Sequence, residues 1–300
     1  KRLFPEYTKA LLSEAAKRPH LVALDADLIL DMGLIAFRDA HPSRFIECGI
    51  AEQDMVSQAG GMALKGLLPV VHSFSCFLST RPNEQIYNNA TEHTRIVYVG
   101  GLSGVIPAIS ALGGSPGRVM VEPCCPEEVA PRFGWCLEHD GPSFLRMASM
   151  PYLTEAAPPK GHKFEKGRGY EVRQGKHGAL MAAGLLGVSE ALQAAKILSK
   201  QGLAFAVIAN PWLNVVDRAW LGEIATRFPL LVTIDNHYRA GGQGQMILAE
   251  IAALNGAQPR CLSLGLDKVP PSGRNEEVLD AIGLDGASIA KRVAEFGGGP

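Results

Sequence analysis

The alternation of short apolar runs with helical patterns is the feature that most constrains the fold of this chain. In the first half, apolar runs predict strands over residues 21–28, 68–75, 95–101, 118–123 and 142–147. Helical patterns lie before or between them, over residues 6–18, 51–64 and 83–92. Strands that are apolar along their whole length are typical of parallel sheets covered on both faces by helices. The first half is therefore predicted to be a three-layer α/β domain.

A segment of different residue composition separates this strand–helix alternation from a second one. Residues 151–170 are rich in Pro, Lys and Gly and lack periodicity, as in an interdomain linker. The alternation then resumes, with strands over 177–184, 204–211, 230–237 and 259–266 and helices over 188–202, 218–229 and 244–256. We therefore predict two parallel-sheet α/β domains, residues 1–150 and 171–300, joined by the linker 151–170.

Composition narrows the class of partner. The formal net charge is −1, with no basic run and no acidic tail, which disfavours nucleic acid or an anionic membrane as the main partner. The hydrophobic share of 47% is enough for a well-buried core. The longest apolar stretches, such as residues 178–188, are too short to span a bilayer. The six cysteines match no zinc-binding spacing, and we expect reduced thiols in a cytoplasmic protein.

One acidic residue marks the junction between a predicted strand and a predicted helix. In residues 44–66, RFIECGIAEQDMVSQAGGMALKG, a short apolar strand and a glycine turn precede a helix that begins near Glu52. Helix capping explains such a carboxylate, because an acidic residue there stabilises the helix by about 0.3–1 kcal/mol. However, its apolar neighbours Ile50, Met55 and Val56 mean that the carboxylate requires a hydrogen-bond donor. A ligand nitrogen is the alternative donor, since α/β folds bind ligands at the carboxyl ends of parallel strands.

An aromatic pair follows the next predicted strand. In VVHSFSCFLSTRPNEQI, residues 71–86, Phe74 and Phe77 are three residues apart beyond the strand end. Simple core packing is one explanation, and an aromatic wall against a flat heterocycle is the other. His72, within the strand, is interpreted as a packed histidine rather than a catalyst.

These two motifs together resemble the pyrimidine-binding domain of transketolases and deoxyxylulose-phosphate synthases, which use thiamine diphosphate. The second half is similar to the C-terminal domain of the same family. The resemblance implies that Glu52 hydrogen-bonds the aminopyrimidine ring of the cofactor and promotes its imino tautomer. It also implies that Phe74 and Phe77 seat that ring. Thr80 stands where the transketolase branch often has a third aromatic residue, so part of the pocket wall differs.

The resemblance also implies a partner. The family holds the diphosphate through Mg²⁺ with a Gly-Asp-Gly motif and a later asparagine, and this sequence has no such motif. We expect an N-terminal transketolase subunit to supply the diphosphate-binding domain and the Mg²⁺ ligands, in a heterotetramer that is a homodimer of heterodimers. The alternative is that this sequence is a fragment of a longer gene product.

The substrate side of the resemblance is less complete. The family has a histidine-containing loop where residues 102–117 contain none. Either the loop is lost, or residues are missing between Pro107 and Ala108; we favour the second, because the sequence there resembles two family segments joined directly. Arg146 lies at a strand end where the family places an arginine that meets a substrate phosphate; a surface ion pair is the alternative. Arg81 is expected to hold a carboxylate at the chain interface and is, with Arg146, a candidate for binding the substrate.

The activity implied by the resemblance is transfer of a ketol unit from a ketose, usually phosphorylated, to an aldehyde. One alternative is a decarboxylating synthase that joins a 2-oxo acid to an aldehyde. Another is the beta subunit of a 2-oxo acid dehydrogenase E1 component, and a third is a non-catalytic protein on the same fold.

Overall fold

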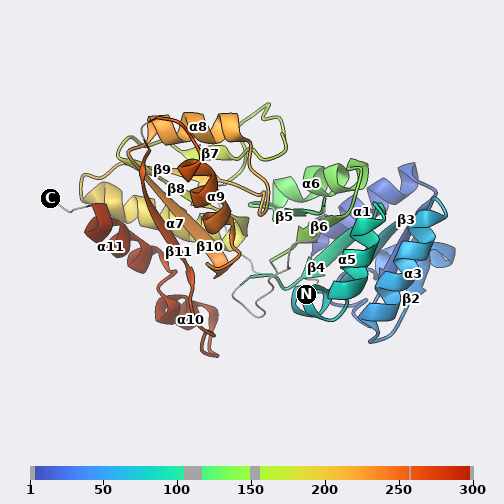
Figure 1. Cartoon of the computed structure of the whole chain (residues 1–300). Coiled ribbons are helices and arrows are strands. Elements are labelled where there is room, and N and C mark those ends of the chain that lie inside the picture. Colours follow the sequence, from blue (N-terminus) through green and yellow to red (C-terminus); the bar gives the residue numbers. More distant parts are fainter. Residues whose placement is uncertain (1–3, 105–116, 149–155, 257, 298–300) are drawn as a thin grey trace. The chain divides into compact units, whose positions relative to one another are not determined.

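A computed structural model describes residues 4–104, 117–148, 156–256 and 258–297. Contacts between Cα atoms divide the chain into two compact units, Lys1–Met150 and Pro151–Pro300, and each is described by itself (Figure 1). The predicted junction near Pro107 and Ala108 lies outside the described residues.

The first unit contains a six-stranded sheet in the order β2-β1-β3-β4-β6-β5, and all of its pairings are parallel. Its strands are β1 (Leu21–Asp25), β2 (Phe45–Glu47), β3 (Leu68–Phe74), β4 (Val97–Gly101), β5 (Val119–Val121) and β6 (Ser143–Arg146). Each predicted strand is confirmed with shorter bounds, including the short strand before Glu52. The strands are apolar throughout because both faces of the sheet are covered.

The helices of the first unit are α1 (Pro5–Lys17), α2 (Ile35–Ala40), the 3₁₀ turn η1 (Pro42–Arg44), α3 (Glu52–Leu64), α4 (Ser75–Thr80), α5 (Asn83–Thr91) and α6 (Pro126–Glu138). The predicted α1, α3 and α5 are confirmed, whereas α2, α4 and α6 were not predicted. Helix α6 escapes sequence patterns because Pro131 lies inside it. Packing holds it in place, since Phe133 meets Tyr7 of α1 with ring centroids 5.1 Å apart.

The second unit contains a five-stranded sheet in the order β11-β10-β8-β9-β7. Its strands are β7 (Tyr170–Arg173), β8 (Gly178–Ala182), β9 (Phe205–Ala209), β10 (Leu230–Tyr238) and β11 (Arg260–Leu266). All pairings are parallel except that of β7, an edge strand antiparallel to β9. The four predicted strands are confirmed, and β7 was not predicted.

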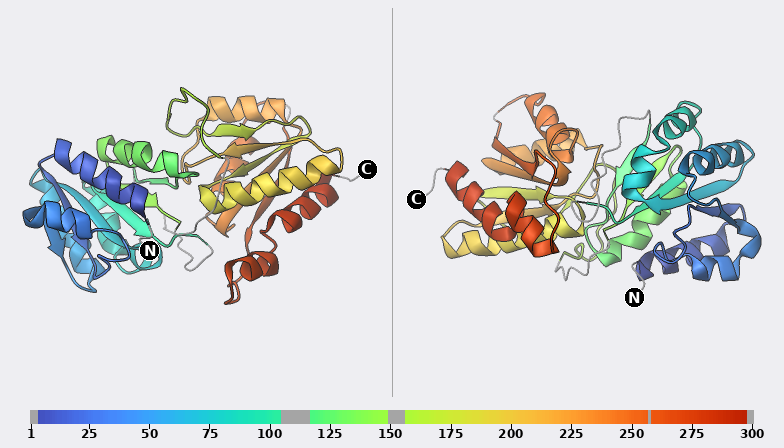
Figure 2. Two further views of the ribbon diagram at one scale, coloured as in Figure 1. Left: turned by 180° about the vertical axis from the view of Figure 1, so that it is seen from behind. Right: turned by 90° about the horizontal axis from the view of Figure 1, so that it is seen from below.

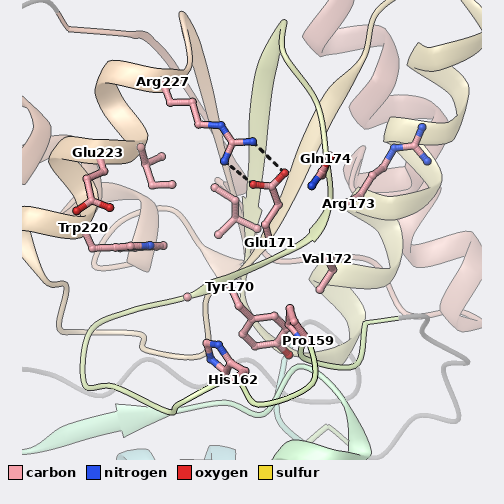
Figure 3. Close-up of a pocket in the computed structure, with 13 residues that line it drawn as sticks. Pro159, His162, Tyr170, Glu171, Val172, Arg173, Gln174, Trp220, Glu223 and Arg227 are labelled. Atoms are coloured by element: carbon pink, nitrogen blue, oxygen red, sulfur yellow. Dashed lines mark hydrogen bonds and ion pairs between the residues drawn. The ribbon is translucent and has the colours of Figure 1, made fainter.

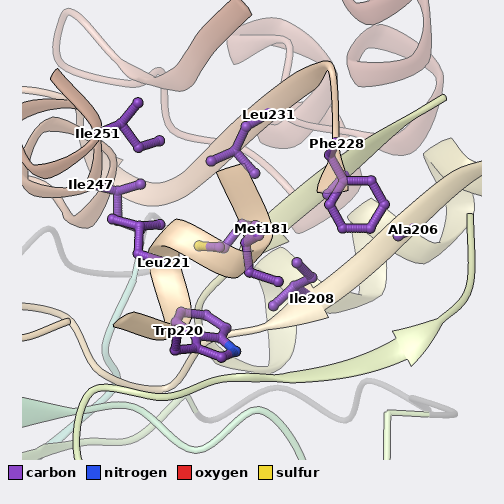
Figure 4. Close-up of a cluster of buried hydrophobic side chains, with 11 residues drawn as sticks. Met181, Ala206, Ile208, Trp220, Leu221, Phe228, Leu231, Ile247 and Ile251 are labelled. Carbon is purple, nitrogen blue, oxygen red and sulfur yellow. The ribbon is translucent and has the colours of Figure 1, made fainter. Parts of the chain in front are cut away.

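Helices cover both faces of the second sheet (Figures 1 and 2). They are α7 (Gly184–Lys200), α8 (Arg218–Arg227), α9 (Gln243–Ala252), α10 (Asn275–Ile282) and α11 (Gly286–Gly297). Helix α7 packs beside α11, and α8 beside α9. Figure 4 shows the core beneath α8 and α9, where Trp220, Leu221 and Ile247 meet side chains of the sheet such as Met181 and Ile208. Both units therefore have the predicted three-layer α/β architecture.

The segment predicted as a linker packs on the second unit over its described part. The Tyr170 hydroxyl donates to the Ala156 carbonyl at 3.1 Å, and the Asp217 amide donates to the Gly167 carbonyl at 3.0 Å. The indole of Trp212 donates to the Arg168 carbonyl at 3.0 Å. These contacts satisfy backbone groups that lie outside any strand, which explains how an aperiodic sequence is held in one place.

The strand order of the first sheet also locates the place where it can bind a ligand. In the first unit the chain runs from β1 outward to β2 and then crosses to the other side of β1 to form β3. The carboxyl ends of β1 and β3 therefore flank a topological switch point, where open α/β sheets bind ligands.

Among the described helices, none combines the length and the apolar character needed to cross a bilayer.

Candidate functional site

Glu52 lies at the first residue of α3, beside the carboxyl end of β3, with only 3% of its side chain exposed. Its Oε1 atom accepts hydrogen bonds from the Ser73 hydroxyl at 3.2 Å and from Arg81 Nη1 at 2.7 Å. Ser73 belongs to β3, so the carboxylate contacts the sheet at the switch point. Capping is therefore not the role of these contacts, although an acidic residue in the first turn still favours the helix dipole.

The predicted aromatic pair lies at the same edge of the sheet. Phe74 ends β3, Phe77 lies on α4, and their half-buried rings are 5.9 Å apart between centroids. The Arg81 guanidinium carbon lies 3.8 Å from the centroid of the Phe77 ring. The structure thus brings four of the five predicted site residues together: Glu52, Phe74, Phe77 and Arg81. The carboxylate that Arg81 holds is one of its own chain.

A second carboxylate flanks this cluster at the carboxyl end of β1. Asp25 is fully buried, pairs in register with Glu47 of β2, and accepts a hydrogen bond from the Leu28 amide at 2.7 Å. Burial raises the pKa of Asp25 to about 7, and the nearby Glu47 carboxylate acts in the same direction. Sequence inspection did not single out Asp25, because a lone acidic residue at a strand end has no distinctive pattern.

His72 is a packed strand histidine, as predicted. Its Nδ1 lies 2.9 Å from the Leu24 carbonyl and its Nε2 lies 2.6 Å from the Tyr7 hydroxyl. Burial lowers the pKa of His72 to about 4, so the ring is neutral at physiological pH. Both ring nitrogens are engaged within the core, which leaves His72 a structural role.

Comparison with known proteins shows to which family the chain belongs. Residues 6–150 match the transketolase pyrimidine binding domain, and residues 167–289 match the transketolase C-terminal domain. A putative uncharacterized transketolase family protein of Sinorhizobium fredii is 30% identical over 303 residues, which cover 96% of this chain and 86% of that protein. The chain belongs to the transketolase family.

Other transketolase-family relatives differ in length. The 1-deoxy-D-xylulose-5-phosphate synthase of Magnetococcus marinus is 31% identical over 308 residues, which cover 97% of this chain and 49% of the synthase. The chain thus spans about half the length of the synthases that it matches. A solved split-gene transketolase, described as an inactive beta4 tetramer, superposes with a TM-score of 0.86 at 26% identity, covering 97% of this chain and 96% of that chain.

The fifth predicted residue, Arg146, lies at the same edge of the sheet but two strands from Ser73, since Gly100 of β4 pairs in register with both residues. It ends β6, its side chain is 1% exposed, and its Nη1 forms an ion pair with Glu122 Oε2 at 2.9 Å. The ion pair is buried rather than at the surface. A second buried pair, Glu128 with Arg132, lies within α6 at 2.7 Å. Whether Arg146 meets a substrate stays a prediction.

The glycine-rich turn of the C-terminal unit uses its polar groups internally. Asp235 accepts hydrogen bonds from the amides of Gln243 at 2.8 Å and Gly244 at 3.0 Å, at the start of α9. A Cβ at position 242 would lie 2.9 Å from the Asp235 carboxylate, so glycine permits this close approach. The carboxylate takes the place that a bound anion would occupy at this helix terminus.

The C-terminal unit also has a cavity of about 690 Å³ beside β7 and α8 (Figure 3). Trp220 and Glu223 reach it from α8, and Tyr170 and Glu171 from β7. Two parallel hydrogen bonds, at 2.6 and 3.2 Å, join Arg227 to Glu171 across it. Glu171 and Arg227 thus neutralise each other, while Arg173 and Glu223 are further charged residues of the lining.

Metal-ligating side chains are not clustered in the part of the chain that the structure describes: no group of three or more His, Cys, Asp or Glu residues there is arranged to hold an ion.

Proposed function

We propose that this chain is the pyrimidine-binding and C-terminal part of a thiamine-diphosphate-dependent transferase of the transketolase type, active with a partner subunit. The reaction is transfer of a ketol unit from a ketose, usually phosphorylated, to an aldehyde. The observation that carries the proposal is a carboxylate, Glu52, that is 3% exposed beside the half-buried Phe74–Phe77 pair at the switch point of the sheet.

The residues present fit the pyrimidine end of the cofactor. A buried carboxylate needs a hydrogen-bond donor, and half-buried aromatic rings offer flat apolar faces to a heterocycle. When bound, thiamine diphosphate supplies a thiazolium carbon that adds to the carbonyl of the donor substrate. Glu52 would share a proton with the ring nitrogen, and Phe74 and Phe77 would orient the ring. Ser73 would keep the carboxylate in place through its hydroxyl.

The diphosphate end requires groups from elsewhere. Magnesium prefers oxygen ligands such as carboxylates, and the described residues contain no such cluster. A partner that carries the diphosphate-binding domain and the Mg²⁺ ligands meets this need. Two observations support it: the chain spans about half of the longer synthases, and the similar split-gene transketolase is described as an inactive beta4 tetramer. Ile50, an apolar residue near Glu52 that is 73% exposed, suits a covered surface.

Arg146 and Arg81 remain the proposed contacts of the substrate. For Arg146, a substrate phosphate would have to compete with the Glu122 carboxylate for the guanidinium. For Arg81, the Glu52 carboxylate is the competitor.

A decarboxylating synthase is the second candidate function. The 31% identity to a 1-deoxy-D-xylulose-5-phosphate synthase over 97% of the chain favours it. Its donor is a 2-oxo acid, so release of carbon dioxide distinguishes it from a ketose-using enzyme.

Reconstitution tests the proposal. The purified chain is assayed alone and with a candidate N-terminal subunit, in the presence of thiamine diphosphate and Mg²⁺, with ketose phosphates or pyruvate as donors. We expect no turnover by the chain alone and turnover by the complex with a ketose donor. Turnover by the single chain would refute dependence on a partner. Acylation of a lipoyl domain would instead indicate an E1 beta subunit.

A further inference from the structure

Arg81 makes two contacts of different kinds with one planar group. Its guanidinium donates to Glu52 Oε1 at 2.7 Å, and the same guanidinium lies 3.8 Å from the centroid of the Phe77 ring. A guanidinium is flat, delocalised and rich in N–H donors, so it can bond a carboxylate in its plane while it stacks on an aromatic face. Glu52 and Phe77 thus already share a flat, nitrogen-bearing group of this chain.

The aminopyrimidine of the proposed cofactor needs the same pair of contacts. It is also flat, bears ring and exocyclic nitrogens, and would meet the Glu52 carboxylate and the aromatic pair. Two planar groups cannot occupy one face of the Phe77 ring together. A ligand ring on the face of Phe77 that Arg81 covers would therefore compete with the Arg81 side chain.

We propose that Arg81 is a built-in placeholder, whose guanidinium occupies the pyrimidine seat on Glu52 and Phe77 until the cofactor displaces it. The inference rests on the function proposed above and adds a step to it, namely release of Arg81 before the ring binds. The placeholder has a physical purpose, because a carboxylate that is 3% exposed needs a counter-charge while the seat is empty.

The surroundings of Arg81 allow this exchange. Its side chain is 40% exposed, so water can receive the guanidinium when it leaves. Its backbone is held, since its amide donates to the Phe77 carbonyl at 2.9 Å and its carbonyl accepts from Gln53 Nε2 at 3.1 Å. Only the side chain has to move. Ser73 also hydrogen-bonds Glu52 at 3.2 Å, and that bond does not involve Arg81.

Thiamine binding to the full-length chain tests the placeholder. Thiamine carries the aminopyrimidine without the diphosphate, so its affinity reports the seat of this chain alone. Isothermal titration calorimetry compares the unaltered chain, Arg81→Met and a matched control, Arg227→Met. Arg227 likewise contacts a phenylalanine ring and pairs with a glutamate, but in the second unit. We expect Arg81→Met to bind thiamine about fivefold to tenfold more tightly, and Arg227→Met to bind as the unaltered chain does.

Thermal unfolding provides a second readout. Without ligand, Arg81→Met should have a lower Tm than the unaltered chain, because Glu52 loses its counter-charge. Saturating thiamine should then raise the Tm of Arg81→Met more than that of the unaltered chain. Methylguanidinium added to Arg81→Met should restore the Tm and weaken thiamine binding, since it fills the vacated seat.

The outcomes separate the placeholder from the proposed function. Unchanged or weaker thiamine binding by Arg81→Met overturns the placeholder. If neither the unaltered chain nor Arg81→Met binds thiamine, the placeholder is also overturned, because removing Arg81 then does not make the site available. Glu52→Gln in the Arg81→Met background decides the function. If Glu52→Gln lowers thiamine binding while Arg81→Met does not raise it, only the placeholder fails. If Arg81→Met binds thiamine and Glu52→Gln leaves that binding unchanged, the function proposed for Glu52 fails.

Discussion

Two arginine–glutamate pairs with nearly the same parts lie in the two units of this chain. In the first unit, Arg81 pairs with Glu52 at 2.7 Å and stacks on Phe77 at 3.8 Å. In the second unit, Arg227 pairs with Glu171 at 2.6 Å and lies 4.6 Å from the Phe228 ring centroid.

Burial of the carboxylate is what separates the two pairs. The Glu52 side chain is 3% exposed, whereas that of Glu171 is 22% exposed. Water solvates the exposed carboxylate and weakens its attraction to the arginine. The buried carboxylate instead depends on whatever donor the protein or a ligand offers. The Arg81–Glu52 pair is therefore a candidate ligand site because its carboxylate is buried, whereas the Arg227–Glu171 pair is not.

The largest expected difference between the two pairs is in catalysis. In the reconstituted complex, Glu52→Gln should lower kcat by about 100-fold or more, because a positioned acid–base group contributes at least that much. Glu171→Gln, the matched change in the second unit, should leave kcat within about twofold, since an exposed pair holds no reacting group. Steady-state kinetics with saturating cofactor measures both. Similar rates for the two variants would mean that Glu52 is not catalytic.

The next prediction concerns an ion pair in which both side chains are buried. Glu128 and Arg132 on α6 form an ion pair in which both side chains are 0% exposed. Arg132→Met should destabilise the first unit by about 3–5 kcal/mol, because it strands a charge in the core. Urea unfolding monitored by circular dichroism gives this value. If the free energy of unfolding fell by less than about 1 kcal/mol, burial would not determine how much these ion pairs contribute to stability.

A buried carboxylate without an arginine gives the third test. The folded-state pKa of Asp25 is raised to about 7 from an ordinary value of 3.8, so the folded state holds its proton where the unfolded chain has lost it. The free energy of unfolding should therefore fall as pH rises from about 4 to about 7 and level off above that. Asp25→Asn should remove this slope and stabilise the chain at pH 8 by about 2–4 kcal/mol. Denaturant titrations between pH 5 and 8 measure the slope, and parallel curves for both proteins would contradict the assignment.

The smallest expected effect is at the exposed pair itself. Arg227→Met should change the free energy of unfolding by about 0–1 kcal/mol, and 0.5 M NaCl should remove most of that difference, because salt screens exposed charges. Thermal unfolding at low and high salt gives both values. A larger loss would show that the cavity beside β7 needs this pair for its structure.

Particular elements show why the sequence reveals some features and hides others. Helix α3 follows a helical pattern and strand β3 a continuous apolar run, so both elements and the positions of Glu52 and Phe74 near their ends can be predicted from the local sequence. Strand β7 has four residues and pairs antiparallel at an edge, which leaves too short a pattern to detect. Helix α6 is held by contacts with α1 that outweigh its internal proline. Arg146 reads as an arginine at a strand end, and only the fold shows that it pairs with Glu122.

The sequence by itself determined the α/β class, the parallel sheets, the resemblance to transketolases and the acidic residue at the strand–helix junction. These features are local, because the periodicity of apolar residues and the residue types in a short motif need no knowledge of distant contacts. The tertiary structure alone decided that Arg81 holds Glu52 across 29 residues and stacks on Phe77. That contact depends on how α3, β3 and α4 pack at one edge of the sheet. Two side chains that are distant in sequence can form an ion pair only when this packing brings them together.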